Sequence, residues 1–186
     1  MTEPQSWILE IRRRLEAPPG REPIVEATSR RAVLVPLAAD AGELWVQLGR
    51  GYGDDDGGGA FPGADLEKGE DVWTGALRGA EEQMKIHPKG VLRLGELDAV
   101  ESFEGGLLTP CIGALPAKLE AEAGESFAEV FRLPLSAFAN PSLVEEKIVE
   151  VDGLQRRVKS YHIGNRRVWG LAADILEDLL ERLGGT

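Results

Sequence analysis

The stretch FPGADLEKGEDVWTGALRGAEEQMKI, residues 61–86, says most about the fold and the chemistry of this chain. It begins with a glycine-containing turn and continues into a helical pattern over residues 71–85. One stripe of this pattern is apolar and comprises Val72, Trp73, Ala76, Leu77, Ala80 and Met84. The opposite stripe is polar and comprises Asp71, Thr74, Arg78, Glu81, Glu82 and Lys85. The pattern predicts an amphipathic helix with one buried face.

Acidic side chains gather where the turn meets this helix. Glu67 and Glu70 precede the helix, and Glu81 and Glu82 lie on its polar side. Carboxylate oxygens suit a hard cation such as Mg²⁺, which also bridges to phosphates. An ordinary exposed helix with an ion pair between Arg78 and Glu82, four residues apart, explains the same spacing. Spacing alone leaves both interpretations open and favours the ordinary helix.

Beyond its spacing, the segment resembles a Nudix box, the loop–helix–loop signature of Nudix hydrolases. The family pattern is Gly, five residues, Glu, seven residues, and then Arg-Glu-apolar-x-Glu-Glu-x-Gly-apolar. The residues that match it are Glu70, Arg78, Ala80, Glu82 and Ile86, after the typical Phe61, Pro62 and Gly63.

Four positions depart from the family pattern. Ala64 and Lys85 replace its two glycines, whereas Gly79 and Gln83 replace two glutamates. In the family, these glutamates help to hold Mg²⁺ or Mn²⁺ near a diphosphate, and one often acts as the base or orients the attacking water. Loss of a general base typically slows a reaction by about 10²–10⁴-fold. The resemblance therefore implies weak or lost hydrolysis.

The same resemblance implies three sets of site residues. The catalytic set is Glu82, Arg78 and Glu70, in which Arg78 orients a glutamate by ion pairing. The metal-binding set, for Mg²⁺ or Mn²⁺ as cofactor, is Glu82, Glu70, Gln83 and Glu81. The substrate-binding set is Arg50, Phe61 and Gly63.

Residues 30–183 are similar to one branch of the family, the coenzyme A diphosphatase-like proteins. The similarity rests on LLTPCIGALP (107–116), AEVFRLPLSAF (128–138) and RRVWGLAADIL (166–176). It implies coenzyme A or another nucleoside diphosphate derivative as the ligand. Against this, the aspartates at 54–56 follow Arg50 and would repel a phosphate-rich ligand. Ser126 also stands where members of the branch commonly carry a metal-binding glutamate, with Glu125 one residue away and Glu129 in the matching strand.

On both sides of residues 61–86, apolar runs along the chain indicate further strands and helices. A β-hairpin is predicted from 31–38 and 43–48, and further strands from 90–97, 107–115 and 127–135. Asp152 and Gly153 mark a second hairpin between 145–151 and 154–162. Helices are expected over 6–16 and 167–183. The prediction is an α+β fold, an α/β/α sandwich of the Nudix type with a central mixed sheet. Residues 1–29 would be an N-terminal helix and linker, and 30–186 a single domain.

The composition and net charge of the chain limit the classes of partner that we expect. The chain has 186 residues, a net charge of −11 and one cysteine. Strong acidity argues against nucleic-acid and membrane partners, and no apolar run is long enough to span a bilayer. A single cysteine and the lack of a signal-peptide pattern suggest the cytoplasm. We expect a nucleotide-derived small molecule as partner, and a homodimer because two-fold pairs are the commonest assemblies.

Gly75 and Gly79 lie four apart inside the predicted helix, where each costs about 0.8–1 kcal/mol relative to alanine. Either a backbone or a ligand approaches that face closely, or the positions have drifted after losing a catalytic duty. His87 and His162 are expected on the surface or in hydrogen-bonded structural roles. A non-catalytic ligand sensor or a protein-interaction module on the same scaffold is the alternative function.

Overall fold

The computed structural model describes residues 6–16, 29–53, 58–102, 105–117, 119, 121–151 and 153–184. The predicted aspartate loop at 54–56 and most of the predicted linker lie outside these residues. The helices are α1 (Ser6–Leu15), α2 (Val72–Met84) and α3 (Leu171–Arg182), with short 3-10 turns η1 (Pro88–Gly90), η2 (Leu135–Ala139) and η3 (Pro141–Leu143). None of these helices is long and apolar enough to cross a membrane.

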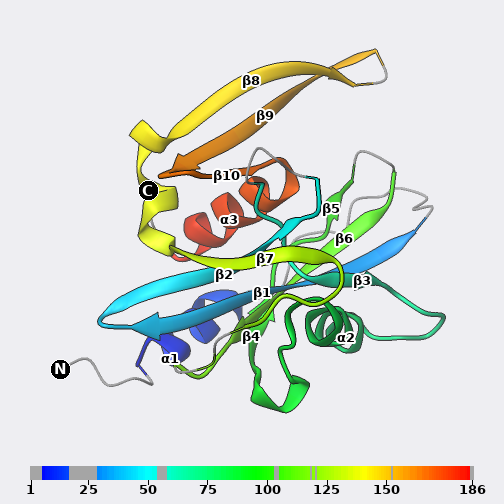
Figure 1. Cartoon of the computed structure of the whole chain (residues 1–186), viewed down its shortest axis with the longest axis vertical. Helices are drawn as coiled ribbons and strands as arrows, with labels where there is room; N and C mark the ends of the chain where they lie inside the picture. Colours follow the sequence, from blue (N-terminus) through cyan, green and yellow to red (C-terminus); the bar gives the residue numbers. More distant parts are fainter. Residues whose placement is uncertain are drawn as a thin grey trace.

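A mixed seven-stranded sheet forms the centre of the molecule (Figure 1). Its strands are β1 (Arg30–Asp40), β2 (Glu43–Gly51), β3 (Gly63–Asp65), β4 (Leu92–Glu96), β5 (Val100–Glu101), β6 (Leu107–Ala114) and β7 (Phe127–Pro134). The main order is β4-β6-β1-β2-β7, in which β1 and β6 run parallel and the other pairs are antiparallel. The short β3 pairs with the first residues of β1, and β5 pairs with β6.

Helices cover both faces of this sheet, so the predicted sandwich is confirmed. Val33, Val35 and Leu37 of β1 belong to the core cluster that includes residues of α1 and α3. Ala32 and Leu34 belong to the cluster beneath α2. The apolar run at 31–38 is continuous rather than alternating because β1 is covered on both sides.

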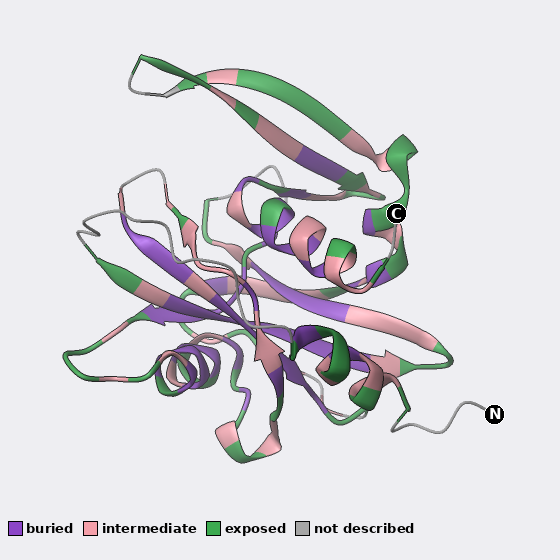
Figure 2. Cartoon of the chain, turned by 180° about the vertical axis from the view of Figure 1, so that it is seen from behind, coloured by how far each residue is buried: buried purple, intermediate pink, exposed green. Residues whose placement is uncertain are grey.

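A second sheet contains β8 (Val144–Val151), β9 (Leu154–Ile163) and β10 (Arg166–Trp169) in the order β10-β9-β8. The predicted hairpin is confirmed: β8 and β9 pair antiparallel, and Gly153 has a φ of +76°. The hairpin extends away from the body (Figure 1), and its outer part is mostly exposed (Figure 2). Ile148 and Leu154 are among its exposed apolar residues.

The predicted final helix is wrong at its beginning. Val168 and Trp169 fit the helical spacing of the residues that follow, but they form β10, where Val168 pairs with Tyr161. Gly170 then takes a φ of +61°, and α3 starts at Leu171. Val168 is buried as expected, whereas Trp169 is 45% exposed. Only Gly170 separates β10 from α3, so the apolar residues of the strand continue the helical spacing of the residues in α3.

The predicted box helix is confirmed almost to the residue. Asp71 caps α2, and its carboxylate accepts hydrogen bonds from the backbone N–H groups of Trp73 and Thr74. Trp73, Ala76, Ala80 and Met84 are buried on the predicted apolar stripe. The helix therefore presents the remaining box residues toward β3 and toward solvent.

Candidate functional site

Gly79 in α2 lies directly against the backbone of Gly63 in β3. A Cβ atom at position 79 would stand 2.3 Å from the carbonyl carbon of Gly63, far inside contact distance. A Cβ at Gly75 would stand 2.3 Å from the end of the Leu66 side chain and 3.5 Å from the Glu70 carboxylate, an ordinary contact distance. The predicted close approach of a backbone is therefore observed at Gly79, whereas the neighbours of Gly75 are side chains. No side chain fits at position 79 unless α2 and β3 move apart.

Gln83 binds the same strand residue. Its Oε1 accepts a hydrogen bond from the backbone N–H of Gly63 at 2.9 Å. The carbonyl oxygen of Gly63 accepts a bond from Nη2 of Arg31 at 3.0 Å. Both polar groups of Gly63 therefore have side-chain partners, and the oxygen of Gln83 is directed at the strand.

Glu70 is held by Arg78 across the loop before α2. Nε and Nη2 of Arg78 donate to the two carboxylate oxygens at 3.2 and 2.9 Å, and the backbone N–H of Glu67 adds a bond of 2.9 Å. The bonds from Arg78, and then that from Glu67, lower the pKa of Glu70. Arg78 also donates to the carbonyl of Asp65 at 2.9 Å. The pair ties α2 to the loop before it, and the glutamate that Arg78 contacts is Glu70.

The other predicted metal ligands, Glu81 and Glu82, are exposed on α2. Glu70 is paired with the guanidinium of Arg78, and Gln83 accepts a hydrogen bond from the backbone N–H of Gly63. Position 79 has no side chain. Among the residues that the structure describes, no three or more His, Cys, Asp or Glu side chains gather as metal ligands. The donors of this box therefore do not fit a divalent cation, and no reaction step is derived through one.

Arg50, predicted to contact substrate, pairs with Glu129 on the neighbouring strand at 3.4 Å. Arg166 of β10 binds the same carboxylate through both nitrogens of its fork, with Nη1 to Oε2 at 2.9 Å and Nη2 to Oε1. Arg166 first, with help from Arg50, lowers the pKa of Glu129 to about 2. This triad joins the second sheet to the edge of the first. Glu125 and Ser126 lie exposed in the turn before β7.

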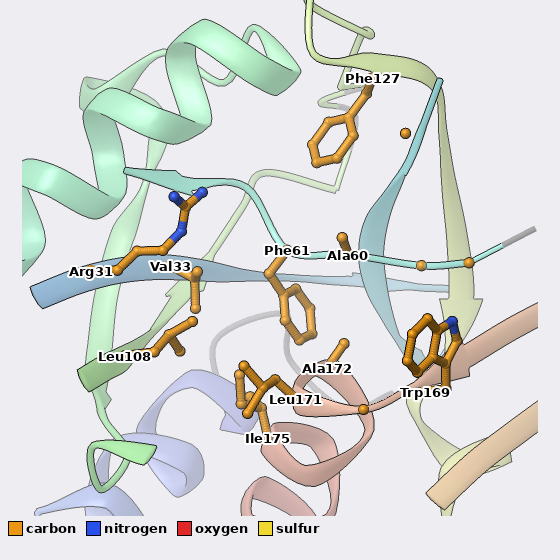
Figure 3. A pocket seen from close by; sticks show the side chains of 14 residues that line it. Arg31, Val33, Ala60, Phe61, Leu108, Phe127, Trp169, Leu171, Ala172 and Ile175 are labelled. Atoms are coloured by element: carbon orange, nitrogen blue, oxygen red, sulfur yellow. The ribbon is translucent and has the colours of Figure 1, made fainter. Parts of the chain in front are cut away.

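A pocket of about 470 Å³ lies on the α3 side of the sheet (Figure 3). Its walls come from β1, the segment before β3, the start of β7 and the junction of β10 with α3. Its lining residues are Arg31, Val33, Gly51, Gly58, Gly59, Ala60, Phe61, Leu108, Phe127, Trp169, Gly170, Leu171, Ala172 and Ile175. In the view of Figure 3, Arg31 and Trp169 stand on opposite sides, with Phe61 between them.

Of the predicted substrate residues, Phe61 lines this pocket, while Gly63 lies beside it under α2. Sequence reasoning missed Arg31, although alternation along a strand puts it on the same face as Val33. It also missed Trp169 as a wall, because the helical pattern assigned that side chain to the core.

The histidines have the structural roles expected of them. Nδ1 of His87 accepts a bond from the backbone N–H of Lys89 at 3.2 Å. Nε2 of His162 lies 3.2 Å from Oγ of Ser160 and 3.3 Å from the carboxylate of Glu145. Because both contacts use the same nitrogen, the imidazole cannot pass a proton between them. Cys111 is a buried free cysteine, and burial raises the pKa of its thiol, which disfavours the reactive thiolate.

Comparison with known proteins points to one family. No family model matches the chain. A Nudix hydrolase NudL of Citrobacter koseri is 32% identical over 165 residues, 86% of either chain, and its Shigella flexneri counterpart is 31% identical over 171 residues, 90% of this chain and 88% of that one.

Solved structures share the fold. A MutT/nudix family protein from Enterococcus faecalis matches 88% of this chain and 65% of its own, with a TM-score of 0.56 and 16% identity. An Ap4A hydrolase of C. elegans matches 58% of this chain and 81% of its own, with a TM-score of 0.50 and 18% identity. The sandwich of helices around a mixed sheet is thus a fold of Nudix proteins. With relatives above 30% identity over nearly the whole chain, this protein belongs to the Nudix hydrolase family.

Proposed function

We propose that this Nudix protein binds a nucleotide-derived small molecule, coenzyme A or another nucleoside diphosphate derivative, and hydrolyses it weakly or not at all. The contact of Gly79 with Gly63 carries the proposal. It leaves no space at position 79 for the glutamate that follows the arginine in the family pattern, and Gln83 is hydrogen-bonded to the strand. Without that glutamate, a general base is missing, which is worth about 10²–10⁴-fold in rate.

Ligand binding is supported by the pocket beside Phe61. Its volume of about 470 Å³ lies within the ordinary range of small-molecule sites. Phe61 and Trp169 offer aromatic surface, which suits the flat base of a nucleotide. The C. elegans protein of the same fold is named as an Ap4A hydrolase, a name that fits this ligand class.

The experiment incubates the purified chain with Mg²⁺ or Mn²⁺ and coenzyme A, ADP-ribose, NADH or dinucleoside polyphosphates. We expect one of these compounds to raise the melting temperature, with turnover slow or undetectable. Any residual turnover should be abolished by Glu82→Gln, because Glu82 is the carboxylate of the predicted catalytic set outside the Arg78 pair. Rapid turnover of any of these compounds would contradict the loss of activity. The absence of both turnover and a thermal shift would contradict ligand binding.

One observation favours the alternative, a protein-interaction module. The β8–β9 hairpin exposes two large apolar residues, Ile148 at 69% and Leu154 at 60%. Exposed apolar side chains on a projecting hairpin suit contact with another protein. The alternative gains if no compound in the panel binds. A homodimer, a cytoplasmic location, use of Mg²⁺ or Mn²⁺ in any residual turnover and a domain boundary near residue 29 stay predictions.

A further inference from the structure

We propose that Arg31 supplies the fixed positive charge of this site, so that the pocket binds the anionic group of its ligand without a divalent cation. The inference rests on the proposed function, because it concerns how the ligand of that pocket is held. It assigns the ligand a phosphate or diphosphate at the Arg31 side and an aromatic body toward Trp169.

The first argument is the position of Arg31. The side chain leaves β1 beside β3, where Arg31 and Asp65 are register partners. Nη2 donates to the carbonyl of Gly63 at 3.0 Å, and Nη1 lies 3.4 Å from the Asp65 carboxylate. These contacts use two of the five N–H donors of a guanidinium. The side chain lines the pocket and is 39% exposed, so a ligand can reach it.

The second argument is the charge of the pocket. The chain contains 32 acidic residues and carries a net charge of −11. Among the lining residues that the structure describes, however, Arg31 is the one charged side chain and the others are apolar or glycine. A positive charge beside apolar walls acts more strongly on an anion than the same charge in open water. The lining therefore favours an anion although the protein as a whole repels anions, and the carboxylate paired with Arg31, that of Asp65, is largely exposed and is not among the lining residues.

The third argument is that Arg31 and the damaged box meet at one residue. Gly79 lies against Gly63, Gln83 binds its N–H, and Arg31 binds its carbonyl oxygen. Gly63, which the resemblance assigns to substrate binding, is thus covered by a helix on one side and bordered by a guanidinium on the other. A guanidinium keeps its charge at any physiological pH and can bind a phosphate through two parallel hydrogen bonds.

The test measures binding of ADP and of adenosine to the full chain by isothermal titration calorimetry, in EDTA and in Mg²⁺. Adenosine is the same nucleoside without the diphosphate. We expect ADP to bind more tightly than adenosine, and equally well in EDTA and in Mg²⁺. Arg31→Met should weaken ADP binding about tenfold to a hundredfold, as expected for losing a hydrogen bond to a charged group. Adenosine binding should not change.

The matched control is Arg30→Met. It removes the same charge one residue earlier, on the opposite face of β1, and should leave both ligands unaffected. The melting temperature of each variant checks folding independently of any ligand.

Several results would overturn the role of Arg31. These are ADP binding that requires Mg²⁺, ADP binding that survives Arg31→Met, equal losses for ADP and adenosine in that variant, or no ADP binding in either buffer. The panel experiment then decides the proposed function separately, because any compound of the panel that binds would sustain it.

Discussion

Arg166 in β10 and Glu129 in β7 form the ion pair that joins the second sheet to the central sheet. Arg50 reaches the same carboxylate from β2, so one acidic side chain connects three strands. The pair lies beside Phe131, whose ring centroid is 4.3 Å from the guanidinium carbon of Arg166. Because the pKa of Glu129 falls to about 2 in the folded chain, this connection depends on pH.

Glu129→Gln should lower the free energy of unfolding at neutral pH. The Glu129 side chain is 38% exposed, so solvent screening limits the loss to about 1 kcal/mol or less. A carboxylate with a lowered pKa stabilises the folded chain fully above about pH 4.5. That contribution disappears as the pH falls toward about 2. Urea unfolding of both proteins between pH 7 and pH 2.5 should show their difference shrinking; a constant difference would contradict the role of the carboxylate.

Gly79→Ala should destabilise the protein by about 1–3 kcal/mol, the usual cost of overpacking. The added methyl group meets the Gly63 backbone, which cannot rotate away as a side chain can. Gly75→Ala is the matched control, because the end of the Leu66 side chain can move and the helix gains up to about 1 kcal/mol. Thermal unfolding compares the two. If Gly79→Ala proved as stable as the wild type, the close contact would not exist in solution.

Gln83→Ala should also be destabilising, by about 1–3 kcal/mol, because it leaves the N–H of Gly63 without its acceptor. Gln83→Glu keeps an oxygen at that place and should retain most of the stability. Glu82→Gln, an exposed substitution on the next residue, serves as the reference in the same urea experiment. A full loss of stability in Gln83→Glu would show that the amide nitrogen, rather than the oxygen, is the important group.

Trp169→Ala should weaken ADP and adenosine by the same factor, about threefold to tenfold, because its ring faces the body of the ligand. The 45% exposure of Trp169 makes a large effect on folding unexpected. Leu154→Ala removes an exposed apolar side chain far along the hairpin and should leave binding unchanged. Calorimetry with both ligands checks this. A loss confined to ADP would place Trp169 near the phosphates instead.

The central fold follows from local patterns in the sequence. Apolar runs such as 31–38 and 107–115 are strands because helices cover both faces of the sheet, and Asp71 marks the start of α2 through its capping bonds. The sequence pattern could not predict the change from β10 to α3 at Gly170, because Val168 and Trp169 also fit the helical period of the residues that follow.

The candidate site was predictable only in outline. The box spacing identified α2, Glu70 and Arg78, and the structure pairs the last two. The partners of Gly63 come from positions 31, 79 and 83, and spacing within one motif cannot show which backbone a distant arginine will reach. The sequence did not indicate that Arg50 pairs with Glu129 on the neighbouring strand, and its predicted contact with substrate stays a prediction.

The contact between α2 and β3 also makes a glutamate at position 79 difficult to introduce. Any larger residue at position 79 should lower the free energy of unfolding, because the backbones of Gly79 and Gly63 are already in contact. A compensating change in the spacing of helix and strand would have to come before, or together with, the new carboxylate. The packing of the two glycines thus opposes the family glutamate at position 79 more strongly than an unconstrained glycine on the helix surface would.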